Sequence, residues 1–239
     1  MHSPYILPHF DARQQYKPNN MFTSHMQSRR PNPPPERPRK AFRSPHRQIA
    51  FRNEYIANEE TRLVLKPQGN AQSAVSFKVI DDADGSVKFT VSGKKYGDRA
   101  CREFRDSSGL PLFELHQKAI LTHSWFVTLP GSDHASIAKA APKWSFVQGI
   151  HDFSLSFENQ AAIDGKNQDE KRIELNIERH GSILALYDVV DGDRKVAVVR
   201  ESIEHNETLP FMNSRWRRYK PILEVTVASG ADMSMVRIS

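Results

Sequence analysis

The sequence lacks the features that would tie it to a membrane or to an oxidising compartment. It has one cysteine, Cys101, in 239 residues, so it cannot form a disulfide within the chain. No apolar run approaches the roughly 18 residues of a membrane-spanning helix. Residues 1–16 lack the basic head and apolar stretch of a secretory signal. These absences predict an intracellular, cytoplasmic protein without a transmembrane segment, with the nucleus as an alternative location.

The sequence also lacks the motifs of common catalytic sites. It has no Gly-x-Ser-x-Gly, no dinucleotide or phosphate-binding glycine loop and no His-Glu-x-x-His. A zinc site built from several cysteines is excluded, and Cys101 is expected to be a small core residue. The histidines show no ligand-like spacing: His116, His123, His151, His180 and His205. We therefore expect no enzyme activity, no cofactor and no metal.

One acidic stretch superficially resembles a calcium loop. Residues 81–85 read Asp-Asp-Ala-Asp-Gly, but the later ligands and the bidentate glutamate of such a loop are missing. A hairpin turn is the preferred interpretation, because Asp caps turns with its side chain and Gly accepts a positive φ.

Positive charge is concentrated at the N-terminus. The net charge is +6, yet residues 1–47 hold nine Lys or Arg against two acids, and the remaining 192 residues hold 25 against 26. The same segment contains nine of the fifteen prolines and few aliphatic residues. It cannot bury enough apolar surface to offset the entropy of ordering, so we predict a disordered tail.

The tail contains two short candidate motifs. Pro35, Pro38 and Lys40 fit a ligand for a polyproline-binding domain, since prolines three apart share one edge of that helix. A solvated linker is the alternative interpretation. Ser44, which precedes a proline, is a candidate phosphosite. Aromatic residues do not interleave with the cations, which argues against specific nucleic-acid binding.

From Thr61 onward the sequence predicts an all-β domain. Turn signals recur about every ten residues, and apolar residues alternate with polar ones, as in Phe153, Leu155 and Phe157. The predicted strands are 61–66, 74–80, 86–92, 99–105, 111–117, 123–129, 144–148, 151–158, 171–179, 182–190, 195–203 and 221–228. Residues 130–143 and 161–171 are expected to be loops, and the first is rich enough in Ala to admit a short helix.

The order of several segments resembles the LURP-one-related family of the tubby C-terminal-like superfamily, which also includes the phospholipid scramblases. These segments are TRLVLK, SFKVIDDADG, FTVSGK, REFRDSSGLPLFEL, HSWFV, HDFSLSFEN and EVTVASGADMSMV. The resemblance implies a closed antiparallel β-barrel of about twelve strands around a C-terminal apolar helix. It divides the chain into a tail, residues 1–55, and a tubby-like domain, residues 56–239.

The chain departs from this pattern at its C-terminal end. Asp232 is a reasonable N-cap, but only a stub of the central helix follows it, residues 233–239. An unfilled barrel would lose stability. Two alternatives remain: a truncated, unstable and non-functional gene product, or a barrel whose axis is filled by another segment or chain.

The resemblance implies no settled activity, and one cluster suggests a function. Arg215, Trp216, Arg217, Arg218, Tyr219 and Lys220 combine cations with aromatics in a predicted loop. This composition suits an anionic membrane lipid such as a phosphoinositide. Lys94 and Lys95 form a second, weaker pair in a predicted hairpin loop. A solvated basic loop with the aromatics packed inward is the alternative.

The sequence therefore leaves two non-enzymatic functions open. One is a lipid-binding adaptor with peripheral membrane association. The other is an interaction scaffold that acts through the proline-rich tail. The oligomeric state cannot be read from the sequence.

Overall fold

The described part of the chain consists almost entirely of β-strands. The computed structural model describes residues 40–68, 76–96, 99–118, 124–132, 135–145, 149–165, 167–179, 185–206 and 221–237. The strands are β1 (Ala41–Phe42), β2 (Thr61–Gln68), β3 (Ser76–Asp81), β4 (Val87–Tyr96), β5 (Arg99–Asp106), β6 (Pro111–Lys118), β7 (Ser124–Thr128), β8 (Ser136–Ser145), β9 (Gly149–Glu158), β10 (Arg172–Arg179), β11 (Ala185–Asp191), β12 (Arg194–Glu201) and β13 (Leu223–Val227). The short helices are η1 (Asn53–Tyr55), η2 (Gln160–Ala162), α1 (Gln168–Lys171) and η4 (Met233–Arg237).

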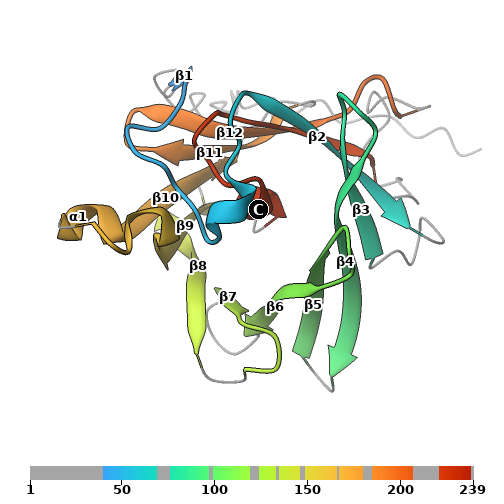
Figure 1. Cartoon of the computed structure of the whole chain (residues 1–239), viewed down its shortest axis with the longest axis horizontal. Helices are drawn as coiled ribbons and strands as arrows, with labels where there is room; N and C mark the ends of the chain where they lie inside the picture. The colour runs from blue at the N-terminus through green and yellow to red at the C-terminus, as the bar shows by residue number, and fades with distance from the viewer. Residues whose placement is uncertain are drawn as a thin grey trace, which may run out of the picture. The chain divides into compact units, whose positions relative to one another are not determined.

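Twelve of these strands form a closed barrel (Figure 1). Strands β2 to β12 pair antiparallel with their neighbours in chain order, and β13 pairs with both β2 and β12. Closure leaves no free sheet edge in the ring. The prediction of a closed antiparallel barrel is confirmed. No helix within the described ranges is long and apolar enough to cross a bilayer.

The barrel wall follows the alternation seen in the sequence. Leu155 lies opposite Leu175 and Phe157 opposite Ile173 in the register of β9 and β10, and all four side chains are buried. Burying one such side chain stabilises the fold by about 1.5–3 kcal/mol. The polar residues between them occupy the other face of the strands.

The hairpin at residues 81–85 forms as predicted. Its Asp81 and Asp84 carboxylates accept hydrogen bonds from the Ala83 and Ser86 amides, and Gly85 has a φ of +71°. The Lys88 ammonium lies 3.2 Å from Asp81 and 3.9 Å from Asp84. These carboxylates therefore have partners within the hairpin.

A second turn held by an aspartate side chain follows β5. Asp106 Oδ1 accepts hydrogen bonds from the amides of Ser108 and Leu110, both at 2.9 Å, and Gly109 has a φ of +88°. The Ser108 hydroxyl donates to the same oxygen, which lowers the pKa of the Asp106 carboxyl. The Asp side chain thus replaces backbone partners that the turn lacks.

Two expectations about loops were wrong. The hairpin loop predicted around Lys94 and Lys95 is strand as far as Tyr96, because β4 pairs with β5 through Lys94↔Cys101 and Tyr96↔Arg99. The predicted loop 130–143 contains most of β8, whose residues pair with both β7 and β9. The neighbouring strands satisfy the β8 backbone, and this overrides the helix propensity of its alanines.

The barrel interior holds an N-terminal segment, residues 49–57, which we call the plug. Ile49, Ala50 and Phe51 are at most 4% exposed and belong to the barrel core or contact it. The centroid of the Phe51 ring lies 4.5 Å from the ring centroid of Phe157 in β9 and 6.4 Å from the ring centroid of Phe113 in β6. The plug therefore joins separate parts of the barrel wall.

The plug corrects the predicted boundary between the tail and the barrel domain. Residues 40–55 were assigned to a disordered tail, but β1 pairs in parallel with the start of β12, and residues 49–51 are core. The few apolar residues in this basic, proline-rich region are the ones that pack inside. The expectation of disorder for residues 1–39 lies outside the described residues.

The C-terminal segment lies beside the plug. Figure 1 shows the cyan η1 next to the red C-terminal end inside the ring of strands. Bridges join Ile49 to Ala231 and Ile56 to Asp232. The helix after Asp232 is the predicted stub, η4, and the Asp232 carboxylate caps it through the Ser234 amide at 2.7 Å. Of the two alternatives, the structure supports a barrel whose interior is occupied by another segment of the chain.

Two buried polar side chains fix the plug. Asp232 Oδ2 accepts hydrogen bonds from the amides of Phe51 and Arg52, at 2.9 and 3.0 Å. Asn159, at the end of β9, accepts from the Ala50 amide and donates to the Gln48 carbonyl, both at 2.9 Å. Both residues are 0% exposed. They satisfy backbone groups that a non-strand segment inside a barrel would leave unpaired.

Phe51→Ala tests whether the plug stabilises the barrel. We expect the free energy of unfolding to fall by about 3–5 kcal/mol, because the substitution leaves a cavity between β6 and β9. Urea unfolding followed by tryptophan fluorescence measures this change. The control Arg43→Ala alters an exposed side chain in the preceding segment and should be near neutral. A loss below about 1 kcal/mol for Phe51→Ala would show that the plug is dispensable.

Asp232→Asn tests the buried carboxylate through pH. Burial raises the pKa of Asp232 above 3.8, and the three amide donors oppose that rise. The pKa of Asp232 is then higher in the folded state than in the unfolded state. Between these two pKa values the folded protein binds more protons than the unfolded protein, so the free energy of unfolding falls as pH rises through that window. Asparagine does not titrate. The stability of the wild type relative to Asp232→Asn should therefore fall as pH rises from about 4.

Urea unfolding of both proteins over a series of pH values measures this difference. A wild-type advantage that grows with pH would contradict the expectation. It would mean that the amide donors outweigh burial and hold the carboxylate ionised.

Candidate functional site

The predicted lipid-binding cluster belongs to the connection between β12 and β13. Arg215, Trp216, Arg217, Arg218, Tyr219 and Lys220 lie outside the described residues, so their prediction stays untested. The structure does describe the residues on either side, up to Asn206 and from Pro221. These flanking residues form the base of the connection.

Asn206 holds the two ends of this connection together. Its Oδ1 accepts a hydrogen bond from the Ile222 amide, and its Nδ2 donates to the Ile222 carbonyl, both at 2.9 Å. Nδ2 also donates to the Ser202 carbonyl at 2.6 Å. One side chain thus binds the chain before and after residues 207–220, and we call this arrangement the Asn206 clasp.

A buried turn supports the Asn206 clasp. Ser202 is 0% exposed, and its amide donates to the Ile222 carbonyl at 3.0 Å. Its hydroxyl lies 2.9 Å from His205 Nδ1 and accepts from the His205 amide at 3.2 Å. The base of the connection is consequently fixed to the barrel by both backbone and side-chain hydrogen bonds.

The second lysine pair lies in a strand rather than in the predicted hairpin loop. Lys94 and Lys95 belong to β4 and pair in register with Cys101 and Ala100 of β5. Their predicted place in a hairpin loop is therefore wrong, and their contact with lipid stays a prediction.

The candidate tail motif is described only at its last residue. Lys40 donates to Glu178 of β10 at 2.6 Å, whereas Pro35 and Pro38 lie outside the described residues. Lys40 would have to leave Glu178 to contact a polyproline-binding domain. The polyproline hypothesis stays a prediction.

The candidate phosphosite lies in the segment that joins β1 to the plug. Ser44 is exposed, and its carbonyl accepts a hydrogen bond from the Arg194 guanidinium at 3.0 Å. Arg47 of the same segment pairs with Asp191. Phosphorylation of Ser44 also stays a prediction.

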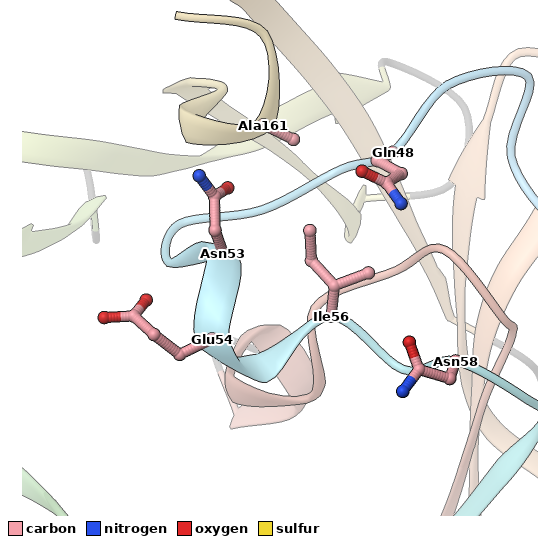
Figure 2. Close-up of a pocket in the computed structure, with 6 residues that line it drawn as sticks. All are labelled: Gln48, Asn53, Glu54, Ile56, Asn58 and Ala161. Atoms are coloured by element: carbon pink, nitrogen blue, oxygen red, sulfur yellow. The ribbon is translucent and has the colours of Figure 1, made fainter.

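A polar pocket lies where the plug leaves the barrel (Figure 2). It has a volume of about 460 Å³ and is lined by Gln48, Asn53, Glu54, Ile56, Asn58 and Ala161. A hydrogen bond from its own backbone amide is the main cause that lowers the pKa of Glu54, and Arg52 adds to it. The lining contains one carboxylate and no cation, which makes the pocket a poor site for an anion. Sequence reasoning missed it because these residues were assigned to the tail or to its edge.

One group of side chains in the described ranges could hold a metal ion. One potential ligand atom each from Cys101, Glu114 and His116 lies within 4.8 Å of the other two. Cys101 is buried, and Glu114 and His116 are half-buried. Sequence spacing missed this group because Cys101 and His116 are opposite each other in the register of β5 and β6. The burial expected for Cys101 is confirmed.

A solved structure of a protein from Arabidopsis thaliana is similar with a TM-score of 0.49 and 16% sequence identity, over 79% of this chain and 92% of that chain. No curated protein sequence matches the chain. The family model described as LURP-one-related matches residues 61–237, which run from the start of β2 to the end of η4. This match spans the whole barrel, and the chain therefore belongs to the LURP-one-related family.

Proposed function

We propose that the protein is a non-enzymatic adaptor that binds anionic membrane lipid through the connection between β12 and β13. Residues 207–220 contain Arg215, Arg217, Arg218 and Lys220 but only one acid, Glu207. Phosphate groups of lipids attract such a cluster, and arginine adds bidentate hydrogen bonds. Trp216 and Tyr219 are residue types that favour the membrane interface.

The Asn206 clasp is the observation that supports this proposal. The clasp holds the chain on both sides of residues 207–220 together, and the four cations stand only two to seven residues before Ile222 in the sequence. The membrane field acts only within about one Debye length of the surface, roughly 8–10 Å. Four cations within six consecutive residues can enter that layer together more readily than cations spread over separate strands.

The proposed binding is electrostatic and peripheral. Each Lys or Arg near an anionic leaflet contributes about 1 kcal/mol to the binding free energy, so four contribute about 4 kcal/mol without an inserted helix. Such binding should weaken as salt is added. It should place the protein at the cytoplasmic leaflet, where anionic lipids are enriched.

A triple variant, Arg215→Ala with Arg217→Ala and Arg218→Ala, tests the proposal. We expect it to bind vesicles containing phosphatidylserine or a phosphoinositide roughly 100-fold more weakly, since three cations at about 1 kcal/mol each are removed. Co-flotation of the full chain with vesicles at low salt measures the partition. Vesicles of phosphatidylcholine alone should not bind either protein.

A matched triple variant controls for net charge. Lys78→Ala with Lys139→Ala and Arg172→Ala removes three exposed cations from β3, β8 and β10, strands that do not flank the connection in the sequence. It should bind like the wild type. An equal loss of vesicle binding in both triple variants would mean that only net charge matters. If the wild type itself does not float with anionic vesicles, the proposal is refuted.

A further inference from the structure

The geometry points to a metal site on the barrel wall, in which Cys101, Glu114 and His116 bind a zinc ion. Cys101 lies on β5 directly opposite His116 on β6, and Glu114 precedes His116 by two residues, which puts it on the same face of the strand. Phe104 and Phe113 of the same strands stack at 4.4 Å in the core. By the alternation of each strand, the three candidate ligands occupy the face away from that ring pair.

The three ligand types fit zinc better than the hard cations. A thiolate, an imidazole and a carboxylate are ordinary zinc ligands, whereas calcium and magnesium take oxygen ligands. In a tetrahedral zinc site, the ligand atoms are about 3.3–3.6 Å apart. The three ligand atoms already lie within 4.8 Å of one another, and binding a zinc ion would draw them closer together. Three protein ligands leave one position open for water or for another group.

The neighbouring side chains support the site. His116 Nε2 lies 3.2 Å from the Thr128 hydroxyl and 3.3 Å from a Glu114 oxygen. Thr128 is 5% exposed, on β7, opposite Glu114 in register. One nitrogen cannot bind both the Thr128 hydroxyl and a metal ion, so we assign Nδ1 as the zinc ligand and Nε2 as the nitrogen whose hydrogen bond to Thr128 orients the ring.

The local charge also favours a cation. Glu103 of β5 lies directly opposite Glu114, and like charges in that position destabilise a sheet. Arg105 forms an ion pair with Glu103. A divalent ion between Cys101, Glu114 and His116 would balance the second carboxylate and the thiolate, and the thiol would release its proton on binding.

Cobalt titration of the metal-free full chain tests the inference. Co²⁺ replaces Zn²⁺ in tetrahedral sites and shows thiolate-to-cobalt charge transfer in the near ultraviolet. We expect one equivalent to bind with this band, and one equivalent of Zn²⁺ to abolish it. Cys101→Ser should remove the band, and His116→Gln should weaken binding at least about 100-fold. The control His46→Gln changes an exposed histidine outside the cluster and should bind like the wild type.

Thr128 provides a test of positioning. Thr128→Val should weaken Zn²⁺ binding about 10-fold or more, and Thr128→Ser should restore it, because only the hydroxyl is needed. Circular dichroism checks that each variant folds. If Cys101→Ser does not fold, a thiol reagent tests the site in the wild type. Zn²⁺ should slow the reaction of Cys101 with the reagent, and Glu114→Gln should remove this protection.

Three results would overturn the inference. One is the absence of a charge-transfer band at Co²⁺ concentrations up to about 1 mM. Another is metal affinity that is unchanged in Cys101→Ser and Glu114→Gln, which would place the metal elsewhere. The third is a Cys101 thiol that reacts at the same rate with and without Zn²⁺. In each case the contact between Glu114 and His116 would be structural only.

Discussion

The barrel depends on hydrogen bonds that hold non-strand backbone inside it. A closed wall of twelve strands satisfies its own backbone groups, but a chain segment that crosses the interior does not. Asp232 and Asn159 provide acceptors and a donor for residues 48–52. Backbone hydrogen bonds add to these, among them the bonds from the Ile49 amide to the Gly230 carbonyl and from the Ala57 amide to the Ala231 carbonyl. With its polar groups paired, the plug can place Phe51 and Ile49 in the core.

This arrangement makes the N-terminal and C-terminal segments dependent on each other. Asp232 caps η4 with one carboxylate oxygen and binds the Phe51 and Arg52 amides with the other. A buried carboxylate is stable only while its hydrogen bonds are made. Loss of the plug would therefore leave a buried acid without two of its donors, in addition to the core contacts of Phe51. The short helix η4 shares the barrel interior with the plug.

Most of the barrel could be predicted from the sequence, and the exceptions have physical causes. Alternation identified β9 and β10 because Leu155, Phe157, Ile173 and Leu175 are large apolar residues with polar neighbours. It failed for β8, where Ala138 and Ala140 are the buried residues. Alanine gives little hydrophobic contrast and favours helix, so only the pairing with β7 and β9 defines that strand. The plug was missed because Ile49 and Phe51 stand among cations and prolines.

The two candidate sites also differ in how far the sequence alone could reveal them. The Arg215–Lys220 cluster is contiguous, so composition alone revealed it, although its surroundings in the fold could not be inferred. The Cys101 group is built across strands. Cys101 and His116 are 15 positions apart, and only the register of the β5–β6 hairpin makes them neighbours. Because register depends on the bulge between Phe104 and Arg105, spacing in the sequence does not determine it.

A barrel with a filled interior restricts where function can reside. The plug and η4 occupy the axis with apolar side chains, so the described interior is a core and not a ligand cavity. Binding must then use the connections at the barrel ends or the outer wall. The Asn206 clasp anchors the most cationic connection, and the Cys101 group lies on the wall. These two sites are built independently, since one depends on loop anchoring and the other on strand register, so a substitution in either should leave the other intact.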